Sequence, residues 1–246
     1  MGEKENQNPA HVSNMSSSKF IEENIPASHR HLAFFFKRMM DVFGSLICLI
    51  IFLPIILITS IAVKASSPGP IIFKQTRVGM NVKPFSFYKF RSMYWNSDDQ
   101  IHRQYVIDSI KGSRKKINQD NGDDPLFEID TDPRITPIGR IIRKLGIDEI
   151  PQFINVLKGD MSLVGPHPSL PYEVEKYEPW QMGRIKGMKP GITGLWQVDG
   201  GSRPSFDDMV RMDLSYIQNW SLWLDVKILV KMVHGTFFSN GAVLRS

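Results

Sequence analysis

The feature that most constrains this chain is an apolar segment near its N-terminus, Val42–Val63, which carries no charged side chain over 22 residues. At about 1.5 Å of rise per residue, a helix of that length could cross the roughly 30 Å hydrocarbon core of a bilayer. The alternative is a buried core helix, which a chain of 246 residues could cover only with all its other helices. We therefore expect this segment to enter a membrane.

Pro54, near the middle of the apolar segment, bears on the choice between two membrane arrangements. Proline removes one helix hydrogen bond and clashes with the carbonyl four residues back, so the helix should bend or break there. Lys37 and Arg38 precede the segment and Lys64 follows it, so the positive-inside rule favours neither side. A straight span would separate the two ends, whereas a re-entrant helix would keep both on the cytosolic face. The symmetric flanks and the proline favour a re-entrant membrane helix over residues 31–66.

Charge and cysteine content limit the partners and the disulfide bonds that the chain can have. The formal net charge of +5 suits an anionic membrane surface, a phosphorylated substrate or nucleic acid. No nucleic-acid recognition motif is present and the basic residues are interleaved with acidic ones, so we expect no nucleic-acid partner. The single cysteine, Cys48, excludes a disulfide framework. Residues 1–30 are polar and lack the apolar region of a signal peptide, which predicts a disordered N-terminal tail.

A β-hairpin is predicted after the apolar segment, with strands over 71–78 and 85–93 and a turn over 79–81. The period-two alternation of a strand places Phe85, Phe87, Lys89 and Arg91 on one face. Two cations beside an aromatic floor could bind a phosphate. An exposed, charged sheet edge would show the same pattern, so spacing alone leaves both interpretations open.

An acidic pair, Asp148–Glu149, lies between two predicted helices. The first begins at Thr136-Pro137 and ends at Gly146, and the second has Asp148 as its N-cap and ends at Gly159. In one interpretation Asp148 only caps the helix. In the other, a carboxylate at an electropositive helix end attacks a phosphate, and Glu149 holds a divalent cation that neutralises a diphosphate.

The last third of the chain contains two Gly/Pro-rich turns, one with His167 and one close to Arg203. A histidine with an ordinary pKa near 6.5 is only partly charged at neutral pH. Ser205 and Asp208 predict a capped helix start. Residues 220–233 form an amphipathic pattern with two tryptophans, which fits either a membrane boundary or a helix packed on the core.

Six blocks of sequence, taken in order, resemble the bacterial sugar transferases known as monotopic phosphoglycosyl transferases. The blocks are KRMMDVFGSLICLIIFLPIIL, GPIIFKQTRVG, FYKFRSM, TDPRITPIGRIIRKLGIDEIPQFINVLKGDMSLVGP, KPGITGLWQV and DLSYIQNWSLWLDVKIL. The resemblance covers roughly residues 35–235. It implies an α+β, mostly helical monotopic membrane domain with a re-entrant N-terminal helix, a small β-hairpin and amphipathic surface helices. Residues 67–240 would then be a catalytic domain on the cytosolic face of the bacterial inner membrane.

The resemblance also implies a reaction. Asp148 would attack the sugar-bearing phosphate of a UDP-sugar, release UMP and form a phosphosugar-aspartyl intermediate. Undecaprenyl phosphate would then attack this intermediate to give undecaprenyl-diphosphate-sugar. Glu149 matches a residue associated with Mg²⁺, and Lys89 and Arg143 match basic positions. The last blocks look like exopolysaccharide-priming members that use UDP-galactose or UDP-glucose. The long members' extra N-terminal transmembrane helices are absent here, so a form limited to the catalytic domain is expected.

Three departures from the family pattern stand out. Leu53 replaces the serine usual before the helix-breaking proline, and His167 and Gly201 replace arginines. Arg203 is the candidate substitute for the second missing guanidinium, and Arg91 and His167 complete the predicted phosphate-binding set. A catalytically silent, membrane-anchored scaffold of the same fold is the alternative that these losses leave open. The choice of sugar and polymer and the oligomeric state, a homo-oligomer included, are not determined by the sequence.

Overall fold

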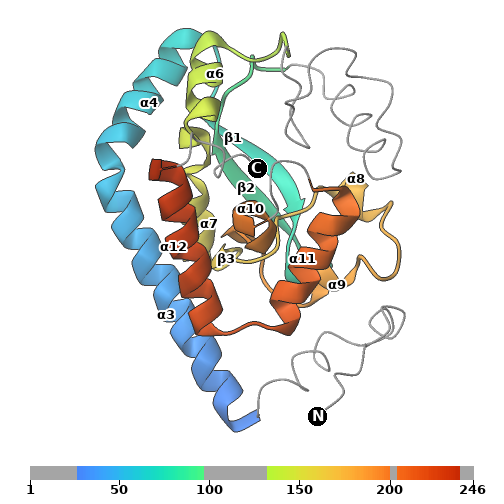
Figure 1. Cartoon of the computed structure of the whole chain (residues 1–246). Coiled ribbons are helices and arrows are strands. Elements are labelled where there is room, and N and C mark those ends of the chain that lie inside the picture. The colour runs from blue at the N-terminus through green and yellow to red at the C-terminus, as the bar shows by residue number, and fades with distance from the viewer. Residues whose placement is uncertain (1–26, 97–131, 200–203, 239–246) are drawn as a thin grey trace.

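A bent pair of helices, α3 (Ala27–Ile51) and α4 (Leu53–Ser66), forms one long edge of the molecule (Figure 1). The computed structural model describes residues 27–96, 132–199 and 204–238, so residues 1–26 of the predicted tail lie outside it. The two helices meet at Phe52 and are bent by 63°. Pro54 lies in the first turn of α4, where its missing N–H costs no helix bond. The bend predicted at Pro54 is confirmed, and its hinge lies two residues before the proline.

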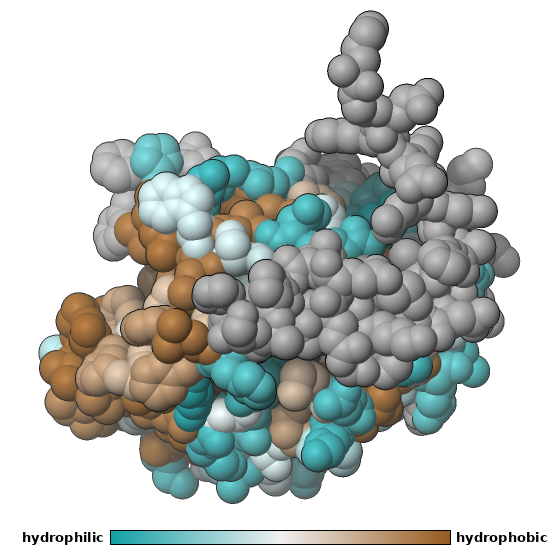
Figure 2. All heavy atoms as spheres, turned by 90° about the horizontal axis from the view of Figure 1, so that it is seen from below, coloured by the Kyte–Doolittle hydropathy of each residue, from teal (hydrophilic) through white to brown (hydrophobic). Residues whose placement is uncertain are grey.

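The outward surface of the bent pair is apolar. No single helix of the described segments is long and apolar enough to cross a membrane, but the pair passes that test together. Large hydrophobic side chains are exposed along both helices: Leu32, Phe35, Phe36, Phe43, Leu46, Ile47, Ile50, Ile51, Leu53, Leu57, Ile58 and Ile61. Figure 2 shows hydrophobic residues gathered along this edge of the molecule. An apolar surface of this size is typical of contact with a membrane or a partner.

The charged residues at the start of the apolar segment face the protein interior. Lys37 is buried and pairs with Asp225 at 2.6 Å, and Arg38 donates to the carbonyls of Val156 and Leu157. Asp41 accepts hydrogen bonds from the Ser162 hydroxyl and the Leu163 amide. Lys37 and Arg38 flank the apolar segment as the sequence indicated, and both also make tertiary contacts.

The predicted hairpin is confirmed as β1 (Ile72–Val78) paired antiparallel with β2 (Pro84–Phe90), joined by a 3₁₀ turn, η1 (Met80–Val82). The second strand ends three residues before its predicted end. Phe73 lies opposite Lys89 and Arg77 lies opposite Phe85 in the register. Directly opposed residues of an antiparallel pair share a face, so this face carries residues of both strands.

The acidic pair lies on a 3₁₀ turn, η2 (Ile147–Glu149), between α6 (Pro137–Lys144) and α7 (Gln152–Lys158). Thr136 caps α6 by accepting from the Gly139 amide, as predicted. The prediction that Asp148 is an N-cap was wrong. Gly146 has a φ of +65° and starts the 3₁₀ turn at once, and α7 then begins after Pro151 without any side-chain cap. The acid is thus inside a turn.

The rest of the chain packs behind η2 and the hairpin. A two-stranded parallel sheet of β3 (Ser162–Val164) and β4 (Gly191–Thr193) packs against α3 and α7, and three short helices also lie in this part of the chain. These are α8 (Pro171–Val174), α9 (Gly183–Lys186) and α10 (Leu195–Asp199). The long helices α11 (Phe206–Gln218) and α12 (Leu222–Phe238) follow, and the predicted Ser205–Asp208 capping box is present.

Helix α12 has one side packed on the core and another side with exposed apolar residues, which are the two alternatives that its sequence left open. Ile228 is buried in the core and Asp225 is fully buried. Trp223 and Val230, in contrast, are 65% and 63% exposed. Because α12 packs on α3, its exposed apolar side chains extend the apolar edge of the molecule (Figure 1).

Candidate active site

The acidic pair is held almost out of solvent. Asp148 is 6% exposed and Glu149 is 8% exposed, and the turn that carries them packs against β2. The turn connects α6 to α7, so two helices and a strand hold its backbone in place. Two neighbouring carboxyls are costly to bury together unless cations compensate them.

Lys89 supplies the first compensating charge. Its Nζ lies 3.0 Å from Oε1 of Glu149 and 5.5 Å from the centre of the Phe87 ring. Burial raises the pKa of Glu149 to about 7, opposed by the charge of Lys89 and increased again by Asp148. Glu149 is therefore able to gain and lose a proton near neutral pH.

Arg77 is a second cation near the acids, and the sequence reasoning missed it. The half-buried guanidinium acts on Glu149 through its charge, lies over the Phe87 ring at 5.1 Å, and donates to Gln75 Oε1 and to the Pro168 carbonyl. The alternation of β1 was the signal available, because Phe73, Gln75 and Arg77 share one face. The sequence prediction of a phosphate-binding face used the alternation of the second strand alone.

Arg91 lies one residue past the end of β2, and its contacts differ from those of Lys89. Arg91 is buried, and its Nη atoms donate to the carbonyls of Val63, Ser67 and Pro68. These bonds tie the end of β2 to the end of α4. Burial lowers the pKa of this guanidinium. The bonds that the structure describes for Arg91 are structural, and its phosphate-binding role stays a prediction.

His167 lies next to the same cluster. Its pKa is well below the usual value because the ring is buried and Arg77, Lys89 and Arg184 add positive charge around it. The imidazole is therefore neutral at pH 7, so the expectation of a partly charged histidine was wrong. Its ring lies edge-on to Trp196 at 6.2 Å, and Nδ1 has no hydrogen-bond partner within the described residues.

A buried ion pair supports the His167 turn from behind. Arg184 Nη2 lies 2.7 Å from Asp213 and donates to the His167 carbonyl at 3.4 Å. Burial raises the pKa of Asp213 to about 6, and the charge of Arg184 opposes that rise. Glu173 accepts a hydrogen bond from the Leu170 amide on the same turn. These contacts fix the position of His167.

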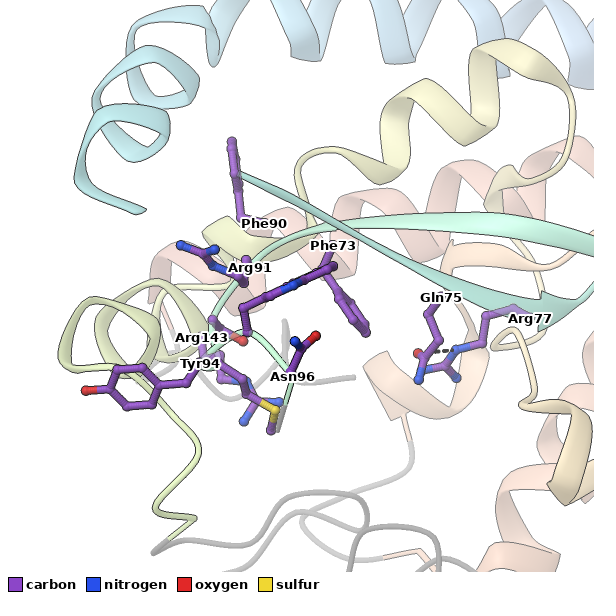
Figure 3. Close-up of a pocket in the computed structure, with 11 residues that line it drawn as sticks. Phe73, Gln75, Arg77, Phe90, Arg91, Tyr94, Asn96 and Arg143 are labelled. Carbon is purple, nitrogen blue, oxygen red and sulfur yellow. Dashed lines mark hydrogen bonds between the residues drawn. The ribbon is translucent and has the colours of Figure 1, made fainter. Parts of the chain in front are cut away.

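A pocket of about 240 Å³ opens on the same face of the hairpin. Three arginines line this pocket (Figure 3). Arg143 from α6 and Arg91 were predicted from the sequence, whereas Arg77 was not. Aromatic residues Phe73, Tyr94 and Trp95 line it as well. Arg203 and Gly201 lie outside the described residues.

The acidic pair is where the family resemblance predicts a magnesium site. The described residues contain no group of three or more His, Cys, Asp or Glu side chains able to hold a metal. Mg²⁺ is nevertheless commonly bound by one or two carboxylates together with substrate phosphates. Asp148 and Glu149 fit that mode, with a diphosphate supplying the remaining oxygens.

Comparison with known proteins places the chain in a family. A family profile described as bacterial sugar transferase matches residues 32–239. This protein belongs to the bacterial sugar transferase family. Residues from the bent helix pair to the end of α12 fall within the match, so the membrane-like edge and the acidic turn both belong to the sugar transferase domain.

Three relatives illustrate the range of this sugar transferase family. "Galactosyl transferase CpsE" of Streptococcus agalactiae serotype III (strain NEM316) is 44% identical over 207 residues, or 84% of this chain and 43% of that protein. "UDP-glucose:undecaprenyl-phosphate glucose-1-phosphate transferase" of Escherichia coli (strain K12) is 37% identical over 213 residues, or 84% and 41%. "Exopolysaccharide production protein ExoY" of Rhizobium meliloti (strain 1021) is 33% identical over 227 residues, or 92% and 96%. The chain thus spans about two fifths of the first two.

Proposed function

We propose that this protein transfers a sugar-1-phosphate from a UDP-sugar to undecaprenyl phosphate, as the priming step of exopolysaccharide or capsule synthesis. The observation that carries the proposal is the buried Asp148–Glu149 turn, compensated by Lys89 and Arg77, in a domain with an apolar bent-helix edge. Cations beside ionisable carboxyls suit a reaction between two phosphate-bearing substrates. The apolar edge suits an acceptor that resides in a lipid bilayer.

The proposed chemistry proceeds in two displacements at one phosphorus. An oxygen of the Asp148 carboxylate attacks the sugar-bearing phosphorus of the UDP-sugar, the bond to the bridging oxygen breaks, and UMP leaves with that oxygen. A phosphate oxygen of undecaprenyl phosphate then attacks the same phosphorus and expels the carboxylate. The products are undecaprenyl-diphosphate-sugar and UMP, and Asp148 is regenerated.

Neighbouring residues have distinct tasks in this scheme. Lys89 and Arg77 stabilise negative charge on the phosphates. Their charges also oppose the rise that burial causes in the pKa of Glu149, so a larger fraction of that carboxyl is ionised. Mg²⁺, held by Glu149 together with the diphosphate, would neutralise charge on the phosphate oxygens. The neutral His167 contributes no positive charge, so Arg77 supplies the guanidinium next to its turn.

The bent pair is proposed to be re-entrant, with the catalytic residues on the cytosolic face of the inner membrane. A 63° bend at Phe52 would return α4 to the leaflet that α3 enters. The test is cysteine labelling in a Cys48→Ser background with an impermeant thiol reagent. Exposed His31 and Lys74, each replaced by cysteine, should label from the same side. Labelling from opposite sides would establish a spanning helix.

UMP release is the direct test of the activity. Purified protein is incubated with Mg²⁺, undecaprenyl phosphate and a panel of UDP-sugars, of which we expect UDP-galactose or UDP-glucose to react. Failure of every UDP-sugar, while a related transferase works in the same assay, would favour the silent scaffold.

The nucleophile is tested separately with Asp148→Asn, which preserves side-chain size. We expect the variant to remain folded and to lose turnover entirely. Wild-type protein is also incubated with the UDP-sugar but without undecaprenyl phosphate. Mass spectrometry should then find one added hexose phosphate on the peptide that contains Asp148. An active asparagine variant, or product formation without that adduct in a trapped reaction, would remove Asp148 as nucleophile.

A further inference from the structure

The pocket on the β1 face of the hairpin has a mixed aromatic and polar lining. It combines an aromatic ring from β1, two carboxamides and the guanidinium of Arg77. Its volume of about 240 Å³ is below the roughly 300–1,000 Å³ of sites that hold whole small molecules. The pocket is therefore suited to one part of a nucleotide-sugar.

The position of Phe73 links the pocket to the acids. Phe73 lies directly opposite Lys89 in the hairpin register, and Lys89 bonds Glu149. Arg77 lines the pocket and also acts on Glu149 through its charge. A ligand that extends from the pocket past Arg77 therefore leads toward the carboxyls.

Phe73 and Asn96 define one end of the pocket. Figure 3 shows the Phe73 ring directed into the hollow on the side of Asn96, with Gln75 and Arg77 farther along the hairpin. Phe73 is 36% exposed although it is a large apolar residue on a polar face. Aromatic rings presented in this way stack on bases.

Asn96 can read the edge of a pyrimidine. Its φ of +65° is in the left-handed region, which asparagine tolerates better than most residues. The carboxamide offers one acceptor and two donors, which match the N3–H and a neighbouring carbonyl of uracil. The Gln75 amide is oriented differently, because its Oε1 accepts from Arg77 Nε at 3.0 Å.

The backbone around Asn96 is anchored. The Tyr94 amide donates to the Arg134 carbonyl, and Met93 forms a bridge with Ile135 just before α6. The Asp132–Arg134 ion pair at 2.7 Å supports that contact. The wall of the pocket is therefore attached to the helix that supplies Arg143, and it can hold a base in a defined position.

We infer that Phe73 and Asn96 bind the uracil of the nucleotide substrate, Phe73 by stacking and Asn96 by pairing with the imide edge, with the phosphates directed past Arg77 toward Asp148. This assignment rests on the proposed function for the identity of the base. It adds two residues that determine nucleotide specificity, and neither of them takes part in the displacement at phosphorus.

The experiment measures UMP and CMP binding to the full-length protein in detergent by calorimetry. Phe73→Leu should weaken UMP binding at least about fivefold, since base stacking contributes about 1–3 kcal/mol, whereas Phe73→Tyr should bind as the wild type does. Asn96→Asp keeps the left-handed backbone but cannot donate to the uracil carbonyl, so it should lower the ratio of UMP to CMP affinity. Thermal denaturation checks that each variant is folded.

The outcomes separate this inference from the proposed reaction. Unchanged UMP affinity in both Phe73→Leu and Asn96→Asp would overturn the inference while UMP release by the wild type still supports the transferase. No UMP binding by the wild type would also overturn it. Conversely, specific weakening in these variants supports the uracil site even if no tested UDP-sugar is turned over.

Discussion

Replacing Lys89 with methionine tests whether its ammonium acts through Glu149. Nζ of Lys89 and Oε1 of Glu149 are 3.0 Å apart, with side chains only 20% and 10% exposed. Methionine keeps most of the side-chain length and removes the charge. Burial and Asp148 both raise the pKa of Glu149, and Lys89 is the main opposing cause. In Lys89→Met the pKa must therefore rise above its value of about 7.

The size of that rise follows from the geometry. An opposite charge within about 4–6 Å changes a carboxyl pKa by about 1–3 units, so the variant should titrate between about pH 8 and pH 10. At pH 7 the ionised fraction of Glu149 would fall from about one half to between about one tenth and one thousandth. If the ionised form is the active one, kcat/KM at pH 7 falls between about fivefold and five hundredfold.

The assay is UMP release at low UDP-sugar concentration, followed from about pH 6 to pH 10. The wild type should lose activity below pH 7 as Glu149 takes up a proton, and Lys89→Met should recover activity as the pH is raised. Glu149→Gln is the control: it cannot ionise, so its activity should stay low at every pH in both backgrounds. A loss in Lys89→Met that is equal at every pH would refute the reasoning and assign Lys89 to direct substrate contact.

Three further predictions concern the scaffold. Lys37→Met should destabilise the protein by about 3–5 kcal/mol, because it leaves Asp225 buried without its cation. Denaturation in detergent measures this, and Lys37→Met/Asp225→Asn should recover part of it, because asparagine removes the unpaired charge and keeps an acceptor for Tyr216 or Trp220. Asp213→Asn should lower the melting temperature less at pH 7 than at pH 5, because a pKa raised to about 6 means that the folded protein favours protonated Asp213, and this stabilisation is lost as the pH rises through about 6; a larger decrease at pH 7 would contradict the raised pKa. Gly139→Ala should be strongly destabilising, because the new Cβ would lie 1.8 Å from the Ser92 carbonyl oxygen; a melting curve unchanged from the wild type would show that α6 moves freely.

Several features could be predicted because they depend on neighbours in the sequence. Pro54 bends the apolar helix since it has no N–H, and an uncharged run of this length has few destinations other than a bilayer. Thr136 and Ser205 cap helices by accepting hydrogen bonds from amides only three residues later in the sequence. Strand alternation predicted the hairpin face that carries Lys89.

Other features depended on packing between distant segments. The pairing of Lys37 with Asp225 joins residues 188 positions apart, so no local pattern could have predicted it. The contacts of Arg91 depend on packing in the same way, since its partners are carbonyls at the end of α4. The wrong N-cap assignment for Asp148 arose because Gly146 and Pro151 permit a 3₁₀ turn where a helix start was expected.

The sequence by itself determined the family pattern, the apolar edge and the presence of an acidic pair, since each is a property of residue types and short spacings. Only the tertiary structure decided the chemical state of the site. Arg77 reaches Glu149 through strand pairing, and desolvation by surrounding elements raises the pKa of that carboxyl to about 7 and keeps His167 neutral. Burial and charge proximity are sums over the whole packed chain, so no local spacing could have predicted them.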